Sequence, residues 1–351
     1  MKMAIDMKQY GLTPSLEKSA GEYEGLVIAR VISQEKGIYR IVCESGEKPG
    51  GITGKLRYSA VTASELPAVG DFVMVDWNEG GNAVIHRVLP RRSCFLRKAA
   101  GNTGKEQVVA ANIDTVFLCM SLNLDFNLRR LERYLSVAWD SGAVPVILLT
   151  KSDLCPDLES RRNDVHSVAM GVDVLTTSMT EENGCRVLLP YFGVGKTAAF
   201  LGSSGVGKST MINHLLGQDR LDTNGLRNDD KGRHTTTRRE LILLPEGGMV
   251  IDTPGMRELG MWDVEEGIER TFADLEELAE KCRFRDCTHS GEPGCAIREA
   301  LDTGVLSMDR WNSFQKLKTE NAYSGDSRSY LLAKERKFKE IAKSNKFNKK
   351  R

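Results

Sequence analysis

Residues 193–210, GVGKTAAFLGSSGVGKST, contain the tetrapeptide Gly-Val-Gly-Lys twice, and one copy has the spacing of a phosphate-binding loop. The spacing G-x-x-x-x-G-K-[S/T] puts glycines at both ends of a short arch, so that backbone N–H groups can turn toward phosphate oxygens. The second copy meets this spacing with Gly202, Gly207, Lys208 and Ser209. The first copy has Pro190 where the leading glycine belongs, and we interpret it as an ordinary loop and helix end.

The elements around the second copy are those that a phosphate loop requires. Residues 197–202 form an apolar run typical of a short buried strand, and residues 209–216 have the pattern of a helix. We expect Lys208 to reach the β- and γ-phosphates of a nucleotide and the Ser209 hydroxyl to ligate Mg²⁺. The predicted phosphate-binding set is Gly202, Ser203, Ser204, Gly205, Val206, Gly207, Lys208, Ser209 and Thr210.

A second motif, Asp-Thr-Pro-Gly at 252–255, follows an apolar run in the later part of the same region. An aspartate at the end of a strand can hold Mg²⁺ through water, and the glycine two residues beyond the threonine can present its N–H to the γ-phosphate. D-x-x-G alone is a weak signal, but here it follows both a strand and a phosphate loop. We therefore expect Asp252 to serve Mg²⁺ and Gly255 to serve the γ-phosphate.

The tetrapeptide Thr-Lys-Ser-Asp at the end of the apolar run 144–149 is a candidate guanine-binding loop. The Asp153 carboxylate can accept hydrogen bonds from guanine N1–H and the exocyclic amine, and the aliphatic part of Lys151 can cover the base. Thr150 stands where such loops usually have asparagine. Ser178, at the end of the next strand-like run, suits a contact to the base oxygen. The predicted base-binding set is Thr150, Lys151, Ser152, Asp153 and Ser178.

The order of these motifs along the chain is unusual for a GTPase. The two base loops come first, the phosphate loop follows, and D-x-x-G comes last. Such a circular permutation is possible because the contacts of a sheet survive when the old ends are joined by a surface loop and new ends open elsewhere. The pattern of buried strands alternating with helices from about residue 110 onward supports a parallel α/β sheet for this region.

The chain divides into regions that differ in their pattern of apolar and polar residues. Residues 22–90 alternate apolar and polar residues between turn signals such as SGEKPGG and NEGGN, which favours a small antiparallel barrel; an OB-type barrel is our preferred version, with other small barrels as alternatives. The chain beyond about residue 262 has helical spacing throughout. The predicted division is an N-terminal extension (1–20), an OB-type barrel (21–95), a circularly permuted P-loop GTPase domain (96–262) and a helical zinc-binding domain with a basic tail (263–351).

The motif order, the preceding barrel and a cysteine cluster at 282–295 together resemble the RsgA (YjeQ/YloQ) family of circularly permuted ribosome-assembly GTPases. The resemblance covers nearly the whole chain. It implies an OB domain, a permuted G domain and a zinc domain. It also implies a GTPase that is stimulated by the small (30S) ribosomal subunit, contacts 16S rRNA and acts late in subunit maturation, as an assembly or release checkpoint.

The cluster CRFRDCTHSGEPGC is a candidate zinc site. It supplies three thiolates and one imidazole, enough to close a tetrahedron around Zn²⁺ and leave no place for water, so its role is expected to be structural. The spacing differs from the common paired C-x2-C knuckle but matches the zinc site of the family that the chain resembles. Unligated thiols are the alternative. The predicted ligands of one zinc per chain are Cys282, Cys287, His289 and Cys295.

Catalytic groups are expected in the threonine-rich segment 232–240, GRHTTTRRE. A threonine from 235–237 can offer its hydroxyl to Mg²⁺, and we favour Thr236. The residue after Gly255 is Met256, so the glutamine that orients the attacking water in many GTPases is missing. His234 is the nearest candidate for that role, and a loop histidine without a catalytic role is the alternative.

Composition is consistent with this interpretation. The chain has 351 residues, a formal net charge of +1 and no apolar run long enough to span a membrane, and its N-terminus lacks the apolar core of a signal peptide. We therefore expect a cytoplasmic monomer. Five cysteines outside the cluster are expected to be buried thiols. Residues 87–105 carry six basic residues and no acid, and residues 331–351 carry nine bases against two acids, so either segment could meet RNA phosphates.

Two other functions deserve comparison with the GTPase. A metabolic P-loop ATPase or kinase would show no guanine preference and would need a pocket for an acceptor substrate. A zinc-stapled RNA-binding scaffold would bind nucleotide passively, without stimulated hydrolysis. The combination of TKSD with DTPG favours the GTPase, with bound GTP or GDP and Mg²⁺.

Overall fold

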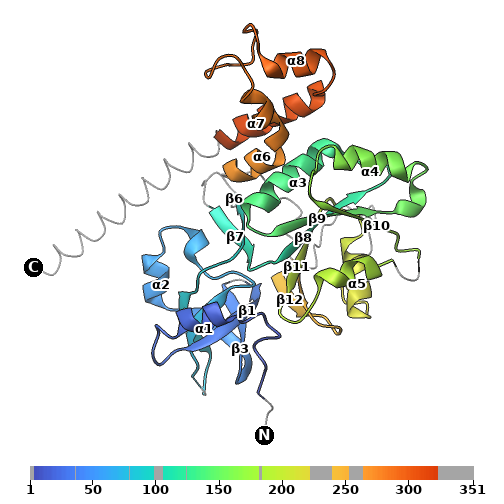
Figure 1. The fold of residues 1–351 in the computed structure, drawn as a ribbon. Coiled ribbons are helices and arrows are strands. Elements are labelled where there is room, and N and C mark those ends of the chain that lie inside the picture. Colours follow the sequence, from blue (N-terminus) through green and yellow to red (C-terminus); the bar gives the residue numbers. More distant parts are fainter. Residues whose placement is uncertain are drawn as a thin grey trace, which may run out of the picture.

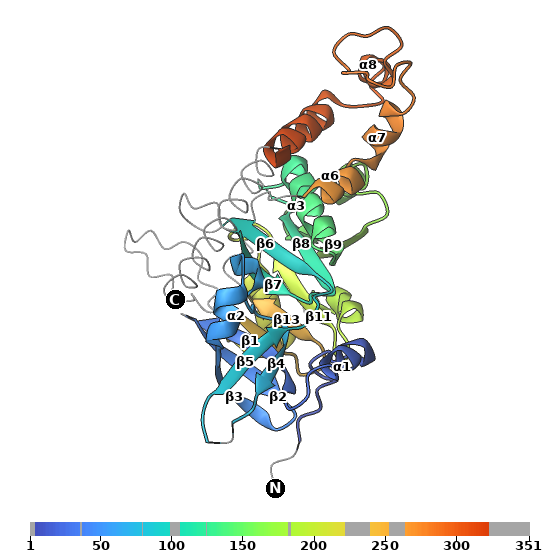
Figure 2. The ribbon, with the colours of Figure 1, turned by 90° about the vertical axis from the view of Figure 1, so that its left-hand side faces the viewer.

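The computed structural model describes residues 4–35, 37–78, 80–98, 106–123, 125–181, 184–221, 239–252 and 264–322. In two perpendicular views the barrel lies at one end, the α/β domain in the middle and the C-terminal helices at the other end (Figures 1 and 2). His234, Thr236, Gly255, Met256 and the basic tail 331–351 lie outside the described residues. Among the described residues no helix has the length and apolarity needed to cross a membrane.

Five strands near the N-terminus form the predicted barrel. They are β1 (Val27–Glu35), β2 (Ile38–Cys43), β3 (Gly46–Ile52), β4 (Phe72–Asp76) and β5 (Ala83–Val88). Their order is β1-β2-β3-β5-β4, and β4 pairs back onto β1, which closes the ring. A short helix, α2 (Gly54–Ser59), and the turn η1 (Ala63–Glu65) connect β3 to β4, as in an OB-type barrel. Alternate residues such as Val31, Ile41 and Val73 are fully buried inside it.

Two details of the barrel differ from the sequence-based expectation. The stretch SGEKPGG was interpreted as a turn, but Gly46–Ile52 forms strand β3 and pairs with β2. Three glycines and Pro49 obscure its strand character, although at Gly50 an added Cβ would lie only 3.2 Å from the Ala83 carbonyl oxygen, so the missing side chain permits close pairing with β5. That β3–β5 pair is parallel, so the barrel is not purely antiparallel. Alternation indicates half-buried strands, but it does not specify which of these strands become neighbours in the barrel.

The central domain is an α/β sheet in the order β10-β9-β8-β11-β13-β12. Its strands are β8 (Thr115–Ser121), β9 (Val144–Thr150), β10 (Asp173–Thr177), β11 (Thr197–Leu201), β12 (Arg239–Leu243) and β13 (Met249–Asp252). All neighbours are parallel except β12, which runs antiparallel to β13. Because β11 lies at the centre but follows β8, β9 and β10 in the chain, the predicted permuted order is confirmed.

Three α-helices of the central domain connect its strands, namely α3 (Leu128–Asp140), α4 (Leu158–His166) and α5 (Lys208–Leu216). Two short 3-10 helices, η2 (Ser152–Leu154) and η3 (Arg186–Tyr191), lie in the loops between them. The Asn127 side chain caps α3, and the apolar side of the helix faces the core, with Leu131 and Leu135 buried. Between barrel and sheet, β6 (Cys94–Lys98) and β7 (Glu106–Ala111) form a separate antiparallel pair, and the boundary predicted at 95/96 falls within β6.

The sheet of the central domain continues directly into the barrel. Strand β12 pairs with β13 on one edge and with β1 on the other, where Ser33 lies opposite Glu240 and Gln34 opposite Arg239. The barrel and the central domain therefore share one eleven-stranded sheet. Nothing in the local sequence of either strand predicts this pairing.

The remaining regular elements among the described residues are helices, as predicted for the C-terminal region. They comprise α6 (Glu265–Thr271), α7 (Ala273–Ala279), α8 (Ala296–Asp302) and the helical residues 308–322. At the N-terminus, α1 (Pro14–Ala20) is capped by Thr13, and Met7, Tyr10 and Leu16 are buried in the same apolar core as the central domain.

Candidate nucleotide site and Cys3His cluster

The phosphate-loop motif lies between the central strand β11 and helix α5, at the carboxyl end of the parallel sheet. Gly205 and Gly207 have φ angles of +76° and +103°, in the left-handed region that favours glycine. A Cβ at Gly202 would lie 2.6 Å from the Cys119 carbonyl oxygen, so only glycine fits beside β8. The glycines are therefore required by the backbone of the arch.

Lys208 begins α5 and lies along this loop. Its Nζ donates hydrogen bonds to the carbonyl oxygens of Gly202 and Ser203, both at 2.6 Å. These bonds hold the ammonium group beside the first turn of a helix, where backbone N–H groups and the helix dipole favour anions. This arrangement can bind a phosphate chain.

The look-alike copy at 193–196 has a different environment. It forms a tight turn before β11, in which the Lys196 N–H donates to the Gly193 carbonyl oxygen at 2.9 Å. Gly195 packs against the N-terminal segment, where an added Cβ would lie 2.8 Å from the Lys8 carbonyl oxygen. The Lys196 ammonium lies 3.6 Å from Asp114. Gly195 of the look-alike copy therefore allows the turn before β11 to pack closely against the N-terminal segment.

The predicted guanine loop reaches the phosphate loop through one hydrogen bond. The buried Thr150 hydroxyl, at the end of β9, donates to the Val206 carbonyl oxygen at 2.8 Å. Thr150, which stands in place of the usual asparagine, thus braces the loop by a side-chain contact. Lys151 adopts a left-handed conformation with φ of 58°, which begins the turn η2.

Asp153 and Ser178, two members of the predicted base-binding set, form a hydrogen bond with each other. The Ser178 hydroxyl, at the end of β10, donates to Asp153 Oδ1 at 2.5 Å and also lies 2.7 Å from the Thr180 hydroxyl. Because β9 and β10 are parallel neighbours, their carboxyl ends place these two loops side by side. The aspartate is therefore fixed at the same sheet edge as the phosphate loop.

Asp252 completes the described part of this edge. It is the last residue of β13, the strand next to β11. Gly255, Thr236 and His234 lie outside the described residues, so their predicted roles stay predictions. The motifs that are described meet at the carboxyl ends of adjacent parallel strands, which is where α/β sheets bind ligands.

One further side chain at this edge of the sheet belongs to none of the predicted motifs. Asp125 lies in the loop between β8 and α3, and its Oδ2 accepts a hydrogen bond from the Ser203 hydroxyl in the phosphate loop at 2.5 Å. Its other oxygen lies 2.8 Å from Arg130 Nη1. Asp125 could have been identified from its position, because it follows the carboxyl end of β8, a buried strand of the same sheet.

The four predicted zinc ligands converge in the loop between α7 and α8. The ligand atoms of Cys282, Cys287, His289 and Cys295 all lie within 4.8 Å of one another. The His289 Nδ1 atom is 3.6 Å from the Cys282 sulfur and 3.5 Å from the Cys295 sulfur. Three thiols and one imidazole at these separations fit a tetrahedral zinc ion by donor type and number.

The loop that carries His289 is held by Glu292. This carboxylate accepts hydrogen bonds from the backbone N–H groups of Thr288, Ser290 and Gly291, at 2.8–3.1 Å. Hydrogen bonds from the Thr288 hydroxyl and from the backbone N–H groups of Glu292, Thr288 and Gly291 hold the pKa of Glu292 well below its usual value. The turn is therefore fixed on both sides of the imidazole, whose residue has a φ of 59°.

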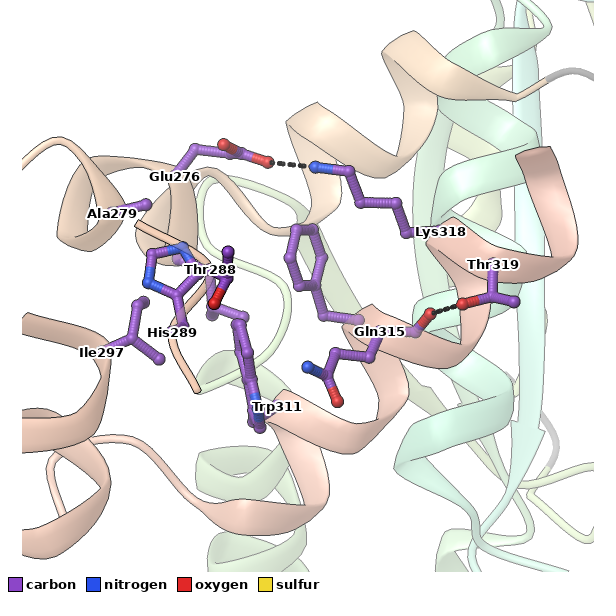
Figure 3. A pocket seen from close by; sticks show the side chains of 11 residues that line it. Glu276, Ala279, Thr288, His289, Ile297, Trp311, Gln315, Lys318 and Thr319 are labelled. Carbon is purple, nitrogen blue, oxygen red and sulfur yellow. Dashed lines mark hydrogen bonds and ion pairs between the residues drawn. The ribbon is translucent and has the colours of Figure 1, made fainter. Parts of the chain in front are cut away.

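The outer face of the imidazole contacts an aromatic side chain. The rings of His289 and Trp311 meet edge to face, with 5.6 Å between their centroids. Figure 3 shows both beside a cavity of about 470 Å³, with Glu276 and Lys318 paired across its rim at 3.8 Å. Trp311 thus supports the ring orientation in which Nδ1 faces the thiols, as outer contacts do in metal sites.

These features define the class of protein. A phosphate loop at a central strand, a base loop at the neighbouring strand ends and a sheet in permuted order characterise a circularly permuted P-loop nucleotide-binding protein. The family model for the RsgA GTPase matches residues 88–262. A small ribosomal subunit biogenesis GTPase RsgA 2 of Lactiplantibacillus plantarum is 48% identical over 95% of this chain and 94% of its own length. The chain belongs to the RsgA GTPase family and is a GTP hydrolase.

Other relatives agree. The small ribosomal subunit biogenesis GTPase RsgA of Opitutus terrae is 47% identical over 89% of this chain and 88% of its own. The crystal structure of YjeQ from Thermotoga maritima superposes with a TM-score of 0.61 at 26% identity, covering 84% of this chain and 98% of that one. That of YloQ, described as a circularly permuted GTPase, gives 0.59 at 25% identity, covering 85% and 95%. The predicted barrel, permuted GTPase domain and helical C-terminal region are confirmed.

Proposed function

We propose that this GTPase binds the small (30S) ribosomal subunit through 16S rRNA and assists its late maturation, with its nucleotide state controlling attachment. The observation that carries this proposal is the relationship over nearly the full chain to proteins named small ribosomal subunit biogenesis GTPases. The segment 87–105 carries six basic residues, of which Arg91 and Arg92 form ion pairs with Asp71 and Asp114, so the other four are the candidates for contacts to RNA. Contacts to RNA phosphates would make the affinity fall steeply with salt.

In this proposal the phosphate loop and its neighbours bind Mg²⁺–GTP. Lys208 contacts the β- and γ-phosphates, while Ser209 and Asp252 serve the metal. Asp153 and Lys151 select guanine, supported by the Asp153–Ser178 contact. Thr236 and His234 remain the proposed switch threonine and water-orienting group.

Phosphate release from GTP and ATP, with and without purified 30S subunits, tests the central claim. We expect slow hydrolysis of GTP alone, strong stimulation by subunits and little reaction with ATP. Lys208→Ala should abolish hydrolysis, whereas the matched variant Lys196→Ala should leave it nearly unchanged because Lys196 pairs with Asp114 at the surface. ATP preference would favour a metabolic ATPase, and nucleotide binding without stimulated hydrolysis would favour a passive scaffold.

Base selection has its own test. Asp153→Asn replaces an acceptor of two hydrogen bonds by a group that also donates one, so GTP affinity and discrimination against other bases should both fall. Competition binding with GTP, ATP and xanthosine triphosphate measures this. Unchanged selectivity would place the guanine contact elsewhere.

The Cys3His cluster is proposed to hold one structural zinc ion. Zinc would tie the loop 282–295 to α8, which begins directly after Cys295. Such ions supply a large part of the folding free energy of small domains. Metal analysis of the purified protein should find one zinc per chain, and Cys287→Ser should lower the stability of the C-terminal helices while GTP binding persists. A metal-free chain with intact C-terminal helices would overturn the assignment.

A further inference from the structure

Asp125 contacts the phosphate loop from outside every motif described above. It lies after β8, and its carboxylate links the Ser203 hydroxyl to Arg130 in the first turn of α3. We propose that Asp125 is a positioning residue for GTP hydrolysis, which holds the phosphate loop through Ser203 so that Lys208 meets the phosphates. This inference rests on the proposed role of Lys208.

Ser203 is the residue through which this effect would act. Its hydroxyl donates to Asp125 Oδ2 at 2.5 Å, while its carbonyl oxygen accepts from Lys208 Nζ at 2.6 Å. The preceding Gly202 rests against the Cys119 carbonyl oxygen. The first two residues of the loop are thus held by β8 on one side and by the loop after β8 on the other. Both carbonyl groups that orient the lysine depend on this support.

Asp125 is itself fixed in place. Its backbone N–H donates to the Asn123 side chain at 3.0 Å, and its Oδ1 accepts from Arg130 Nη1 at 2.8 Å. Arg130 is held in turn, because its own N–H donates to Asn127, the capping residue of α3. The carboxylate therefore connects the phosphate loop to a helix that is anchored in the core.

The charge environment keeps this carboxylate ionised. Burial acts to raise the pKa of Asp125, but hydrogen bonds from Ser203 and Arg130 and the positive charges of Arg130 and Lys151 lower it overall. An ionised acceptor makes a stronger hydrogen bond to a hydroxyl than a neutral one does. Pairing with Arg130 also offsets the repulsion that a free carboxylate would exert on a bound phosphate chain.

The expected effect is on turnover more than on substrate binding. A lysine displaced from the place where charge develops in the transition state loses stabilisation there, and small displacements can cost large factors in rate. We expect Asp125→Ala and Ser203→Ala each to lower kcat for GTP at least tenfold, with a change in KM of less than about threefold. A loss of packing alone would not separate kcat from KM in this way.

The experiment is a double-mutant cycle on subunit-free GTP hydrolysis by the full-length protein. If Asp125 acts through Ser203, the double variant should be no slower than either single variant. Ser203→Thr keeps the hydroxyl, so it should recover most of the kcat that Ser203→Ala loses. Glu47→Gln is the charge-matched control, because Glu47 forms an exposed pair with Arg40 between strands β2 and β3 of the barrel.

The outcomes separate this inference from the proposed function. Unchanged kcat in both Asp125→Ala and Ser203→Ala, with hydrolysis abolished in Lys208→Ala, overturns the positioning role alone. Fully multiplicative losses in the double variant overturn it as well. Unchanged hydrolysis in Lys208→Ala overturns the phosphate-loop assignment and this inference together. If Asp125→Ala unfolds in a thermal melt, Ser203→Ala, Ser203→Thr and the control decide the question.

Discussion

The central domain is joined to the barrel and to the C-terminal helices by two junctions of different construction (Figure 2). On the barrel side, strand β12 pairs with β1, and a Cβ at Gly70 would lie 2.0 Å from the Ala111 carbonyl oxygen. On the helical side, α3 packs against α6, and a Cβ at Gly267 would lie 1.9 Å from the Ser136 carbonyl oxygen. Each junction thus brings two backbones into direct contact at a glycine.

A buried arginine completes each junction, but the two arginines have different partners. Arg30 of the barrel is fully buried, and within the described part of the chain it donates only to uncharged groups. These are the carbonyl oxygens of Tyr10, Gly70 and Asn112, the Thr197 hydroxyl and the Met249 sulfur. Burial lowers the pKa of Arg30 to about 9, so the guanidinium stays charged at neutral pH.

Arg310 of the C-terminal helices donates instead to two carboxylates. It contacts Glu132 of α3 at 2.9 Å and Asp274 of α7 through two bonds at 2.5 and 2.9 Å. Glu132 also accepts from Ser313 and Arg129. The junction at Arg310 should therefore be more sensitive to a single change. Leaving a buried charge without its counter-charge costs more free energy than leaving an uncharged acceptor without its donor.

The largest effect is expected from breaking the ionic junction. Glu132→Ala removes a fully buried carboxylate and leaves Arg310 with one fewer counter-charge, which should lower the free energy of unfolding by about 3–5 kcal/mol. Chemical denaturation followed by circular dichroism measures it. Asp164→Asn, in an exposed pair with Arg161, should cost well under about 1 kcal/mol. Equal shifts for the two variants would contradict the comparison.

A smaller effect is expected at the barrel junction. Arg30→Met removes hydrogen bonds to several buried acceptors but also removes the unfavourable burial of a charge, so the free energy of unfolding should fall by about 1–3 kcal/mol. The Gly70 carbonyl oxygen keeps its bond from the Asn112 side chain. Denaturation under the same conditions measures the change. A loss larger than that of Glu132→Ala would reverse the proposed order of the junctions.

The sequence predicted the parts of this molecule whose signals are local. The phosphate-loop motif, the candidate base loop 150–153 and the Cys3His cluster each lie within a short stretch of sequence, so the spacing of a few residues is enough to identify each one. Pro190 was enough to separate the look-alike from the phosphate loop. The permuted order followed from the positions of these motifs, because each marks the end of a known strand.

The parts that could not be predicted depend on residues far apart in the chain. Ser203 and Asp125 are separated by 78 positions, and Arg310 and Glu132 by 178, so neither member of a pair marks the other. The pairing of β1 with β12 could not be predicted from the side chains of either strand, because backbone hydrogen bonds make it. Strand β3 was missed for a different reason, since its glycines and Pro49 are turn-forming residues that here serve close strand packing.

The smallest expected effect concerns an ion pair at the edge of the helical junction. Arg133 of α3 binds Glu320 through two hydrogen bonds at 2.7 and 3.1 Å, but the two side chains are 28% and 36% exposed. The Arg133 hydrogen bond lowers the pKa of Glu320 from its usual 4.5, against the opposing effect of burial and with help from the charges of Arg133 and Lys316. A carboxyl whose pKa is lowered by folding stabilises the folded state above its unfolded pKa, and that contribution disappears as the pH falls through the folded value.

Because solvent screens the pair, Glu320→Gln should cost only about 0.2–1 kcal/mol at pH 7. Melting temperatures of both proteins across a series from pH 7 to below the folded pKa should converge at the acid end, and a difference that persists there would assign the effect to packing of the side chain rather than to its charge.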